Sequence, residues 1–396
     1  AYEKIRRSLH EFGYVDPVIW NEVTGNIVGG HQRYKVLVAE GATEIDCVVV
    51  HIENRQEEKA LNIALNKAVG EWEPVALADL LSDLKISGYD LDITGFDAAE
   101  VDDLFSQVHD KDVKEDDFDV GAELKQPCFS RMGDVWHLGR HTVICGDTTL
   151  PETFERLLGD ARVNLVCTDA PYFVALKNKS GTIANDDLND KQAYEFLIKC
   201  FTNFKNAMAK DASIYEFYAT MKTRVFYDAF EDAGFKVGAG LVWKKPRAPL
   251  MRTDWKFNME PIIWGWRKDG KHIWYGDQKQ TSVFEFDGIR DSEKEGFGHP
   301  SSKPVPLIAY LIKQCTQTNG LVLDGFLGSA STLIACEEIS RSCFGVEIEP
   351  KFVDVAVKRY VHYHDGQTED VYLMRDGQRM SFEEAMAEMQ ESANGE

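Results

Sequence analysis

A short apolar run that ends in an acid, a proline and an aromatic residue constrains this chain more than any other stretch. Residues 163–168, Val-Asn-Leu-Val-Cys-Thr, are mostly apolar or β-branched, which predicts a buried strand. Pro171 cannot donate to a strand ladder, so the strand ends before it. Asp169, Ala170 and Tyr172 therefore lie at the carboxyl end of the strand. In open α/β sheets, ligands bind at that edge.

The chemistry of this turn suits an amino group. An ionised Asp169 only accepts hydrogen bonds, and the carbonyl of Ala170 is a second acceptor, which Pro171 holds beside it. The ring of Tyr172 offers a stacking surface of the kind that holds a nucleotide base outside its duplex. The turn predicts an exocyclic amine of a base as the target. An ordinary turn that ends a strand has the same composition, so the motif alone leaves that alternative open.

Two motifs together carry a family resemblance. Residues 169–172 resemble the Asp-Pro-Pro-Tyr catalytic motif of amino-directed DNA methyltransferases. Residues 321–332, Leu-Val-Leu-Asp-Gly-Phe-Leu-Gly-Ser-Ala-Ser-Thr, resemble the segment with which that family binds S-adenosylmethionine. Their order, catalytic motif first, resembles the β-class arrangement. The resemblance implies a circularly permuted, Rossmann-like α/β domain over residues 129–365, with S-adenosylmethionine as the cofactor and no required metal.

The same resemblance implies a donor site assembled from several segments. Ser302 and Lys303, in a segment similar to the family's His-Pro-Thr-x-Lys-Pro, would contact the methionine end of the donor. Asp147 would lie near its adenine ring, although it could equally cap the helix that begins near Pro151. Glu347 ends a strand about 20 residues after the donor loop, the spacing at which a carboxylate binds ribose hydroxyls; a surface glutamate is the alternative. The donor loop itself contributes Asp324, Phe326, Gly328 and Ser329.

Several positions depart from the family's pattern. Ala170 replaces the first proline of the catalytic motif, and Gly325 replaces a proline of the donor loop. Ala330 replaces the second glycine of that loop, and Leu327 adds apolar bulk to it. These changes surround both expected ligands. They leave open a weakened enzyme, or one that uses a modified donor.

Residues 1–105 are predicted to form a separate unit. A glycine pair, Gly29 and Gly30, precedes a helix that opens with His31, and such a turn suits an anion held on backbone N–H groups. With residues 11–13, 64–67 and 95–97, this turn resembles the ParB/sulfiredoxin-like superfamily, also called the ParB-like nuclease domain. The resemblance implies an α+β domain that binds a nucleotide or nucleic acid through Gly30, His31 and Arg33. For His31, a capping or packing role is equally compatible.

The charge pattern separates a linker from a candidate DNA surface. The chain has a formal net charge of −22, unexpected for a DNA partner, because phosphate binding relies on Lys and Arg. Seven acids and two lysines between Asp110 and Glu123 predict a solvated acidic linker, which we place at residues 106–128. Near Trp243 and Trp255 the local charge is positive instead, and basic residues mixed with aromatic ones suit a nucleic-acid groove. The candidate DNA-binding residues are Lys177, Lys244, Lys245, Arg247, Arg252 and Lys256.

Other features limit the class of protein. The eight cysteines contain no Cys-x-x-Cys pair, which argues against a zinc site or a disulfide framework and favours reduced thiols. No apolar run approaches the roughly 18 residues of a membrane span, and no signal peptide is recognisable. The chain begins at Ala1 inside an expected helix, which suggests truncation. Residues 366–396 are expected to form a tail with a small hairpin and an acidic helix.

The function predicted from these patterns is transfer of a methyl group to N6 of adenine in double-stranded DNA, in the cytoplasm of a bacterial or phage-infected cell. Adenine is favoured because residue 169 is Asp, where cytosine-N4 members more often carry Ser. The alternatives are a cytosine-N4 methyltransferase, an adenine alkyltransferase with a modified donor, a non-catalytic DNA-binding protein, and a hydrolase centred on His31 and Arg33. The sequence leaves the oligomeric state open, a homodimer included.

Overall fold

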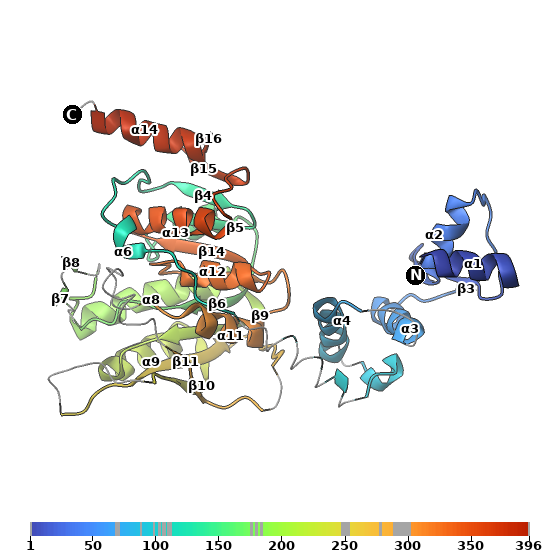
Figure 1. Cartoon of the computed structure of the whole chain (residues 1–396). Helices are drawn as coiled ribbons and strands as arrows, with labels where there is room; N and C mark the ends of the chain where they lie inside the picture. The colour runs from blue at the N-terminus through green and yellow to red at the C-terminus, as the bar shows by residue number, and fades with distance from the viewer. Residues whose placement is uncertain are drawn as a thin grey trace. The chain divides into compact units, whose positions relative to one another are not determined.

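The computed structural model describes residues 2–67, 72–87, 89–97, 100–101, 104, 108, 113–174, 177–178, 181–182, 185–246, 254–276, 279–287 and 302–394. The chain divides into two compact units, Ala1–Asp110 and Lys111–Glu396 (Figure 1).

The first unit combines a small sheet with helices. The sheet has the order β2-β1-β3, in which β1 pairs antiparallel with β2 and parallel with β3. The helices α3 and α4 together form an apolar core of this unit, in which Ala60, Ile63, Leu81 and Leu84 are buried. The elements are α1 (Tyr2–Phe12), β1 (Val18–Asn21), β2 (Ile27–Gly29), α2 (His31–Ala39), β3 (Cys47–Val50), α3 (Arg55–Lys67), α4 (Pro74–Ile86) and the 3₁₀ helix η1 (Leu91–Thr94).

The second unit is built on one mixed sheet of eleven strands, ordered β12-β10-β11-β9-β6-β13-β14-β5-β4-β15-β16. A separate short hairpin pairs β7 with β8. The strands are β4 (Val135–Leu138), β5 (His141–Cys145), β6 (Val163–Thr168), β7 (Lys177–Asn178), β8 (Gly181–Thr182), β9 (Met208–Phe217), β10 (Phe235–Lys244), β11 (Met259–Arg267), β12 (Val283–Glu285), β13 (Leu321–Asp324), β14 (Ser342–Glu347), β15 (Val371–Arg375) and β16 (Gln378–Ser381).

Five central strands of this sheet are parallel. They lie in the order β5-β14-β13-β6-β9, and each neighbouring pair is parallel. In the common doubly wound order 3-2-1-4-5, β13 holds the first position and β5 the third. Along the chain, β5 comes first and occupies the third position. The strands that occupy the first two positions, β13 and β14, come last. The predicted permuted, Rossmann-like α/β fold is confirmed, and the order reverses between β13 and β6.

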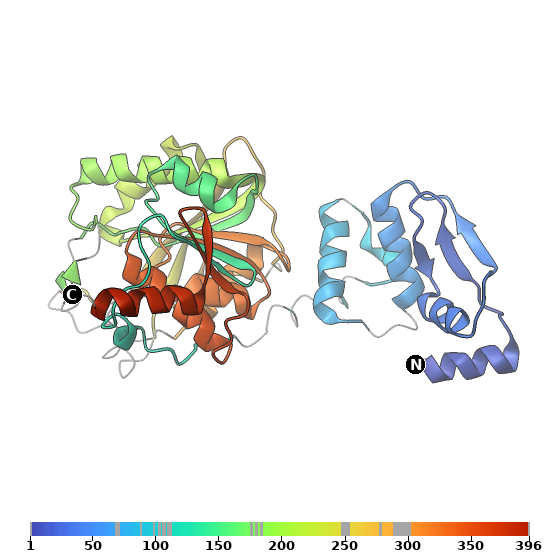
Figure 2. The ribbon, with the colours of Figure 1, turned by 90° about the horizontal axis from the view of Figure 1, so that it is seen from above.

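Helices cover both faces of the sheet. One apolar cluster joins the sheet to α7, α8 and α9, and another joins it to α11, α12 and α13. Figure 2 shows the strands between the green helices and the orange to red ones. The helices are α6 (Val120–Glu123), α7 (Pro151–Leu158), α8 (Asp190–Ala207), η2 (Thr220–Lys222), α9 (Thr223–Asp232), α11 (Val305–Cys315), α12 (Ser331–Glu338), α13 (Pro350–Tyr363) and α14 (Phe382–Asn394).

The C-terminal hairpin belongs to the sheet rather than to a separate tail. β15 pairs antiparallel with β4 and also with β16, and Leu373 is fully buried. The hairpin and the acidic helix were predicted from their local pattern. Their attachment to β4 was not, because a pairing between strands so far apart in sequence leaves no local signal.

Residues 113–123 contradict the prediction of a solvated linker. Val113 and Val120 are buried, and α6 begins at Val120, capped by Asp119. Glu115 accepts a hydrogen bond from the backbone N–H of Val305, 2.7 Å away, at the start of α11. Three other acids meet basic partners on α13, in the pairs Asp116–Arg359, Asp117–His362 and Glu123–Lys358. Composition predicted a tether because these partners lie more than 180 residues further along the chain.

Three further features bear on the class of protein. No helix within the described ranges is long and apolar enough to cross a membrane. All eight cysteines are free, and six are buried. Among the described side chains, no group of three or more His, Cys, Asp or Glu is placed to hold a metal ion.

Candidate active site

Five acidic residues mark the carboxyl edge of the parallel strands. Asp147 follows β5, Glu347 ends β14, Asp324 ends β13, Asp169 follows β6 and Glu216 lies near the end of β9. Because these five neighbouring strands are parallel, their carboxyl ends lie along one edge of the sheet. The sequence predicted four of these residues and missed Glu216, an acid inside an apolar strand.

A buried ammonium group lies against Asp169. The Nζ of Lys303 donates a hydrogen bond to Asp169 Oδ2 and lies 3.3 Å from Oε2 of Glu260, on β11. Only 5% of the Lys303 side chain is exposed. The other oxygen, Asp169 Oδ1, is buried and accepts no hydrogen bond from the described residues. One oxygen of Asp169 is therefore open to a further donor.

Glu260 connects two lysines and a tyrosine. Lys245 Nζ lies 2.5 Å from Glu260 Oε1, and the Tyr172 hydroxyl donates to Glu260 Oε2 over 3.0 Å. The Lys303 ammonium also lies 5.2 Å from the centroid of the Tyr172 ring. Glu260 and Lys245 were not predicted as parts of this site, because β11 is two strands away from β6 in the sheet and carries no recognised motif.

The charges of this cluster offset one another. Burial raises the pKa of Asp169; Lys303 opposes the shift and Glu260 adds to it. Burial alone would raise the pKa of Glu260, but Lys303 and Lys245 lower it to about 2. Burial lowers the pKa of Lys303, but Asp169 and Glu260 outweigh burial, so the net direction is upward. Lys303 thus stays protonated between two carboxylates.

Glu216 holds the backbone of the turn at residues 169–172 through a hydrogen bond. Its side chain is fully buried, and its Oε1 accepts a hydrogen bond from the backbone N–H of Ala170 over 3.2 Å. Burial raises the pKa of Glu216 well above its ordinary value, while the bond from Ala170 opposes this and Asp169 adds to it. A buried carboxyl group therefore holds the residue that replaces the motif's first proline.

Asp324 links the loop after β13 to β6. Its Oδ1 accepts hydrogen bonds from the Thr168 hydroxyl at 2.7 Å and the backbone N–H of Phe326 at 3.0 Å. Its Oδ2 accepts from the Thr332 hydroxyl at 2.6 Å. Burial raises the pKa of Asp324 to about 6, although these bonds oppose the shift. The two threonines were not predicted, since only the fold brings Thr168 beside β13.

Glu347 is tied to the same loop. Its Oε2 accepts from the backbone N–H of Gly328 at 2.8 Å, and its Oε1 accepts from that of Glu349 at 2.9 Å. Gly328 has a φ of +49°, which suits a glycine. Burial raises the pKa of Glu347 to about 7. Glu347 is 8% exposed, so the alternative of a surface glutamate is wrong.

The remaining predicted donor residues lie nearby with different partners. Asp147 is half-buried and accepts from the backbone N–H of Thr149 at 2.8 Å. It does not cap α7, whose N-cap is Leu150. Ser302 Oγ is buried without a hydrogen bond among the described residues. Ser329 is buried, and its carbonyl accepts a bond from Arg359 at 2.5 Å.

The packing accounts for two of the departures in the donor loop, Gly325 and Leu327. A Cβ at Gly325 would lie 2.4 Å from the ring of Phe204, so that ring fills the space a larger residue would need. The ring of Phe326 is 6.3 Å from that of Phe204, centroid to centroid. The Leu327 side chain fills the space in which a Cβ at Gly345 would lie. Ala330 has a φ of +67° and is the N-cap of α12, where a glycine is usual.

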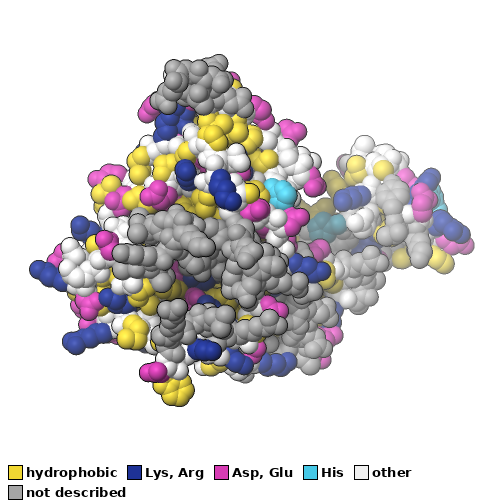
Figure 3. All heavy atoms as spheres, turned by 60° about the vertical axis from the view of Figure 1, so that its left-hand side comes forward, with side chains coloured by type: hydrophobic (Ala, Val, Ile, Leu, Met, Phe, Trp, Pro, Cys, Tyr) yellow, Lys and Arg dark blue, Asp and Glu magenta, His cyan; other side chains and the backbone are white. Residues whose placement is uncertain are grey.

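Of the predicted DNA-binding residues, the structure describes the side chains of Lys244, Lys245 and Lys256. Lys244 pairs with Glu285 at 2.7 Å. Trp243 is a core residue rather than a flanking surface aromatic, with Lys245 lying 4.9 Å from its ring centroid. Lys256 and Trp255 are exposed. Arg247 and Arg252 lie outside the described residues, as does the Lys177 side chain. On the face shown in Figure 3, the coloured Lys and Arg side chains lie among Asp and Glu.

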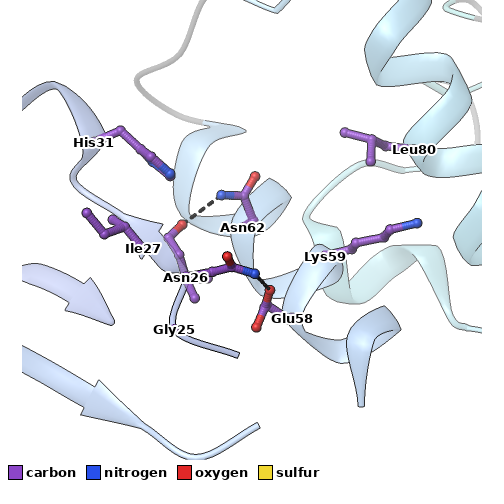
Figure 4. A pocket seen from close by; sticks show the side chains of 9 residues that line it. Gly25, Asn26, Ile27, His31, Glu58, Lys59, Asn62 and Leu80 are labelled. Carbon is purple, nitrogen blue, oxygen red and sulfur yellow. Dashed lines mark hydrogen bonds between the residues drawn. The ribbon is translucent and has the colours of Figure 1, made fainter. Parts of the chain in front are cut away.

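The first unit has a cavity of about 480 Å³ near the predicted ParB-like site. His31 lines it, together with Glu58, Lys59 and Asn62 of α3, and its ring points toward Asn62 (Figure 4). Gly30 has a φ of +84° and is the N-cap of α2. Arg33 pairs with Asp16 and is not part of the cavity lining. The structure brings only His31 of the three predicted residues to this cavity.

Comparison with known protein families identifies two matching segments. Residues 163–358 match the model of the N6/N4 methyltransferases, described as DNA methylase. Residues 75–132 match a model described as the ParB-methyltransferase HTH domain, which begins in α4. The first range contains Asp169, Lys303, Asp324 and Glu347.

Several known proteins are similar to part of this chain. Type II methyltransferase M2.MboI of Moraxella bovis is 26% identical over 225 residues, covering 51% of this chain and 81% of the relative. Type II methyltransferase M2.DpnII of Streptococcus pneumoniae is 24% identical over 219 residues, covering 50% of this chain and 82% of the relative. The solved PvuII DNA methyltransferase, described as cytosine-N4-specific, aligns with 17% identity and a TM-score of 0.48 over 69% of this chain and 97% of its own.

Proposed function

Since this chain is an S-adenosylmethionine-dependent DNA methyltransferase of the N6/N4 family that also carries a ParB-methyltransferase HTH domain, we propose that it methylates N6 of adenine. The observation that carries the proposal is the open oxygen of Asp169. It is buried, belongs to the catalytic turn, and accepts no hydrogen bond from the described residues. An exocyclic amine supplies the N–H donor that this oxygen lacks.

The residues at the sheet edge fit the donor. Each Glu347 oxygen already accepts one backbone N–H and can accept a second donor, such as a ribose hydroxyl. Ser302 Oγ, buried and without a partner in the described part of the chain, is open to a carboxylate at the methionine end. Asp147 lies at the end of β5, two strands from Asp324. We assign the binding of S-adenosylmethionine to the residues along this edge: Asp147, Ser302, Asp324, Phe326, Gly328, Ser329 and Glu347.

The protein's own part in the reaction is orientation and proton acceptance. When bound, S-adenosylmethionine would supply a methyl group from a positively charged sulfur, which would keep the electron pair of the broken carbon–sulfur bond. The amine N6 would bond to the methyl carbon and give up one proton. Asp169 and the Ala170 carbonyl hold the two N–H groups, and Tyr172 stacks on the extruded base. Asp169 receives the proton, because burial raises its pKa.

Adenine is preferred over cytosine because residue 169 is Asp, whereas cytosine-N4 members of the family more often have Ser there. Cytosine N4 is the second candidate, since its amine lies beside the same kind of ring nitrogen. We assign DNA contacts to Lys256 and to the HTH segment. Because its substrate is DNA, we expect the protein to act in the cytoplasm of a bacterial or phage-infected cell.

Mass spectrometry of nucleosides tests the proposal. DNA is incubated with the protein and S-adenosylmethionine, digested, and compared with DNA from cells that produce the protein. We expect N6-methyladenine in both samples and its loss in the Asp169→Ala variant. Asp160→Ala, which removes an exposed acid in the turn after α7, is the control and should retain activity. N4-methylcytosine alone would overturn the choice of base, and activity in Asp169→Ala would overturn the site.

A further inference from the structure

We propose that Lys303 reads the ring nitrogen beside the exocyclic amine of the target base, and that Glu260 positions Lys303 for this contact. The inference rests on the proposed function, because it concerns how the same site selects its base. It gives Lys303 a different role from the donor contact that its motif implies.

The first argument is that the hydrogen-bonding groups of the site match those on the edge of an amino base. Asp169 offers an acceptor, and the Lys303 ammonium lies beside it as a donor. Adenine presents the complementary pair, the N6 amine as donor and N1 as acceptor, on adjoining atoms. Cytosine presents the same pair with N4 and N3. Guanine and thymine present a carbonyl oxygen and a ring N–H instead, which would face acceptor with acceptor and donor with donor. The pair therefore selects amino bases over keto bases.

The second argument is the position of Lys303 between two carboxylates. Before a base enters, its ammonium is bonded to Asp169 Oδ2. When Lys303 turns from Asp169 Oδ2 to the ring nitrogen, it needs another negative charge nearby, since an unpaired buried ammonium is costly. Glu260 Oε2 is only 3.3 Å away. Lys303 can thus reach the ring nitrogen without losing charge compensation.

The third argument concerns Glu260 itself. Its side chain is 17% exposed and is fixed from two directions, by Lys245 and by the hydroxyl of Tyr172. Those bonds hold the carboxylate in place when Lys303 moves. Glu260 comes from β11, outside both family motifs, so neither motif accounts for its presence. We therefore regard Glu260 as a positioning residue and Lys303 as the residue that contacts the base.

The test removes the ring acceptor from the substrate. Once sequencing of modified DNA has located the target site, two duplex oligonucleotides are compared, one with adenine and one with 1-deazaadenine, in which N1 is replaced by CH. A hydrogen bond to a charged donor corresponds to roughly 10- to 100-fold in kcat/KM. We expect the wild-type protein to lose this factor on the deaza substrate, and Lys303→Met to be slow on both substrates with a ratio near one.

Other effects of the deaza substitution cancel in this comparison. The changed base is easier to extrude because it pairs more weakly, but this applies equally to both proteins. Lys191→Met, which removes an exposed lysine from α8, is the control and should keep the wild-type ratio. Equilibrium binding of the two oligonucleotides without donor gives a second readout, in which only a protein with Lys303 should prefer adenine.

The role of Glu260 has its own signature. Glu260→Gln should reduce the penalty for the deaza substrate to less than about threefold, and Glu260→Asp should restore part of it. A purely structural role would lower activity on both substrates equally and leave the ratio unchanged. Affinity for S-adenosylmethionine is measured for each variant by calorimetry and should change little.

The failure of this inference is separable from that of the proposed function. If the wild-type protein methylates adenine but shows the same deaza penalty as Lys303→Met, Lys303 does not read the ring nitrogen. A Lys303→Met variant that loses donor binding and keeps the penalty would return Lys303 to the donor site. Absence of any transfer by the wild-type protein would overturn the proposed function itself.

Discussion

Asp116 and Arg359 form a buried ion pair that anchors the acidic segment 113–123 to the donor loop. The Nε and Nη2 atoms of Arg359 both lie 2.8 Å from Asp116 Oδ2. The side chains are 3% exposed for Arg359 and 10% for Asp116. Arg359 also donates to the carbonyl of Ser329, a predicted donor-site residue. Asp116 therefore supports a guanidinium group that in turn holds the loop.

We predict that Asp116→Asn destabilises the second unit strongly. Removing one partner of a buried pair leaves the other charge uncompensated, which costs about 3 kcal/mol of unfolding free energy. Urea unfolding monitored by tryptophan fluorescence measures the change. Asp117→Asn is the matched control, because the adjacent Asp117 is exposed and pairs with His362 at the surface; it should leave the unfolding midpoint almost unchanged. Equal effects of the two substitutions would show that Arg359 does not depend on Asp116.

We predict that Gly325→Ala is destabilising in a way that depends on Phe204. The added methyl group would lie 2.4 Å from the Phe204 ring, and overpacking of this kind costs roughly 1–3 kcal/mol. In a Phe204→Leu background the same change should cost less, because the ring that it meets is absent. Phe201→Leu, the same substitution one turn earlier in α8, is the control and should give additive effects. Additivity in both backgrounds would contradict the explanation of the departure at Gly325.

The features predicted correctly from sequence were those written in short segments. Residues 163–172 predict a strand with an acid at its end, and residues 321–332 predict a strand, a loop and the start of a helix, because each signal lies within about a dozen residues. The order of the two motifs was enough to predict the permutation. The structure confirms the fold that these signals imply.

The features that were missed depend on pairs far apart in the chain. Lys303 lies against Asp169 although 134 residues separate them, and Glu260 meets both through a strand with no motif. The acidic segment was predicted to be solvated because its basic partners on α13 are more than 230 residues away. Local composition cannot distinguish a solvated acid from one that has a distant partner.

We predict that Trp255→Ala weakens DNA binding. The Trp255 side chain is 85% exposed and follows a basic stretch in sequence, which suits stacking on a base. Loss of one stacked base corresponds to roughly 1–3 kcal/mol of binding free energy. Fluorescence anisotropy with a labelled duplex measures the affinity, while affinity for S-adenosylmethionine should not change. Met221→Ala, which removes another highly exposed apolar side chain at 78%, is the control. An unchanged dissociation constant for Trp255→Ala would exclude this contact.

We predict that Glu347 makes the second unit less stable as the pH rises from 4.5 to 7. Burial raises the pKa of Glu347 from 4.5 to about 7, so between these values the folded state binds more protons than the unfolded state. The free energy of unfolding therefore falls with increasing pH, by about 3 kcal/mol at roughly 1.4 kcal/mol per pKa unit, and levels off above pH 7.

The Glu347→Gln variant isolates this contribution. Glutamine stays neutral and keeps an acceptor for the Gly328 N–H, so the unfolding free energy of the variant should fall less over the same pH range. Asp324, with a pKa of about 6, contributes in the same direction and should leave a residual slope. Glu155→Gln, at an exposed position of α7, should keep the wild-type slope. Urea unfolding at several pH values between 4.5 and 8 measures all three proteins, and identical slopes for wild type and Glu347→Gln would show that Glu347 ionises normally in the folded chain.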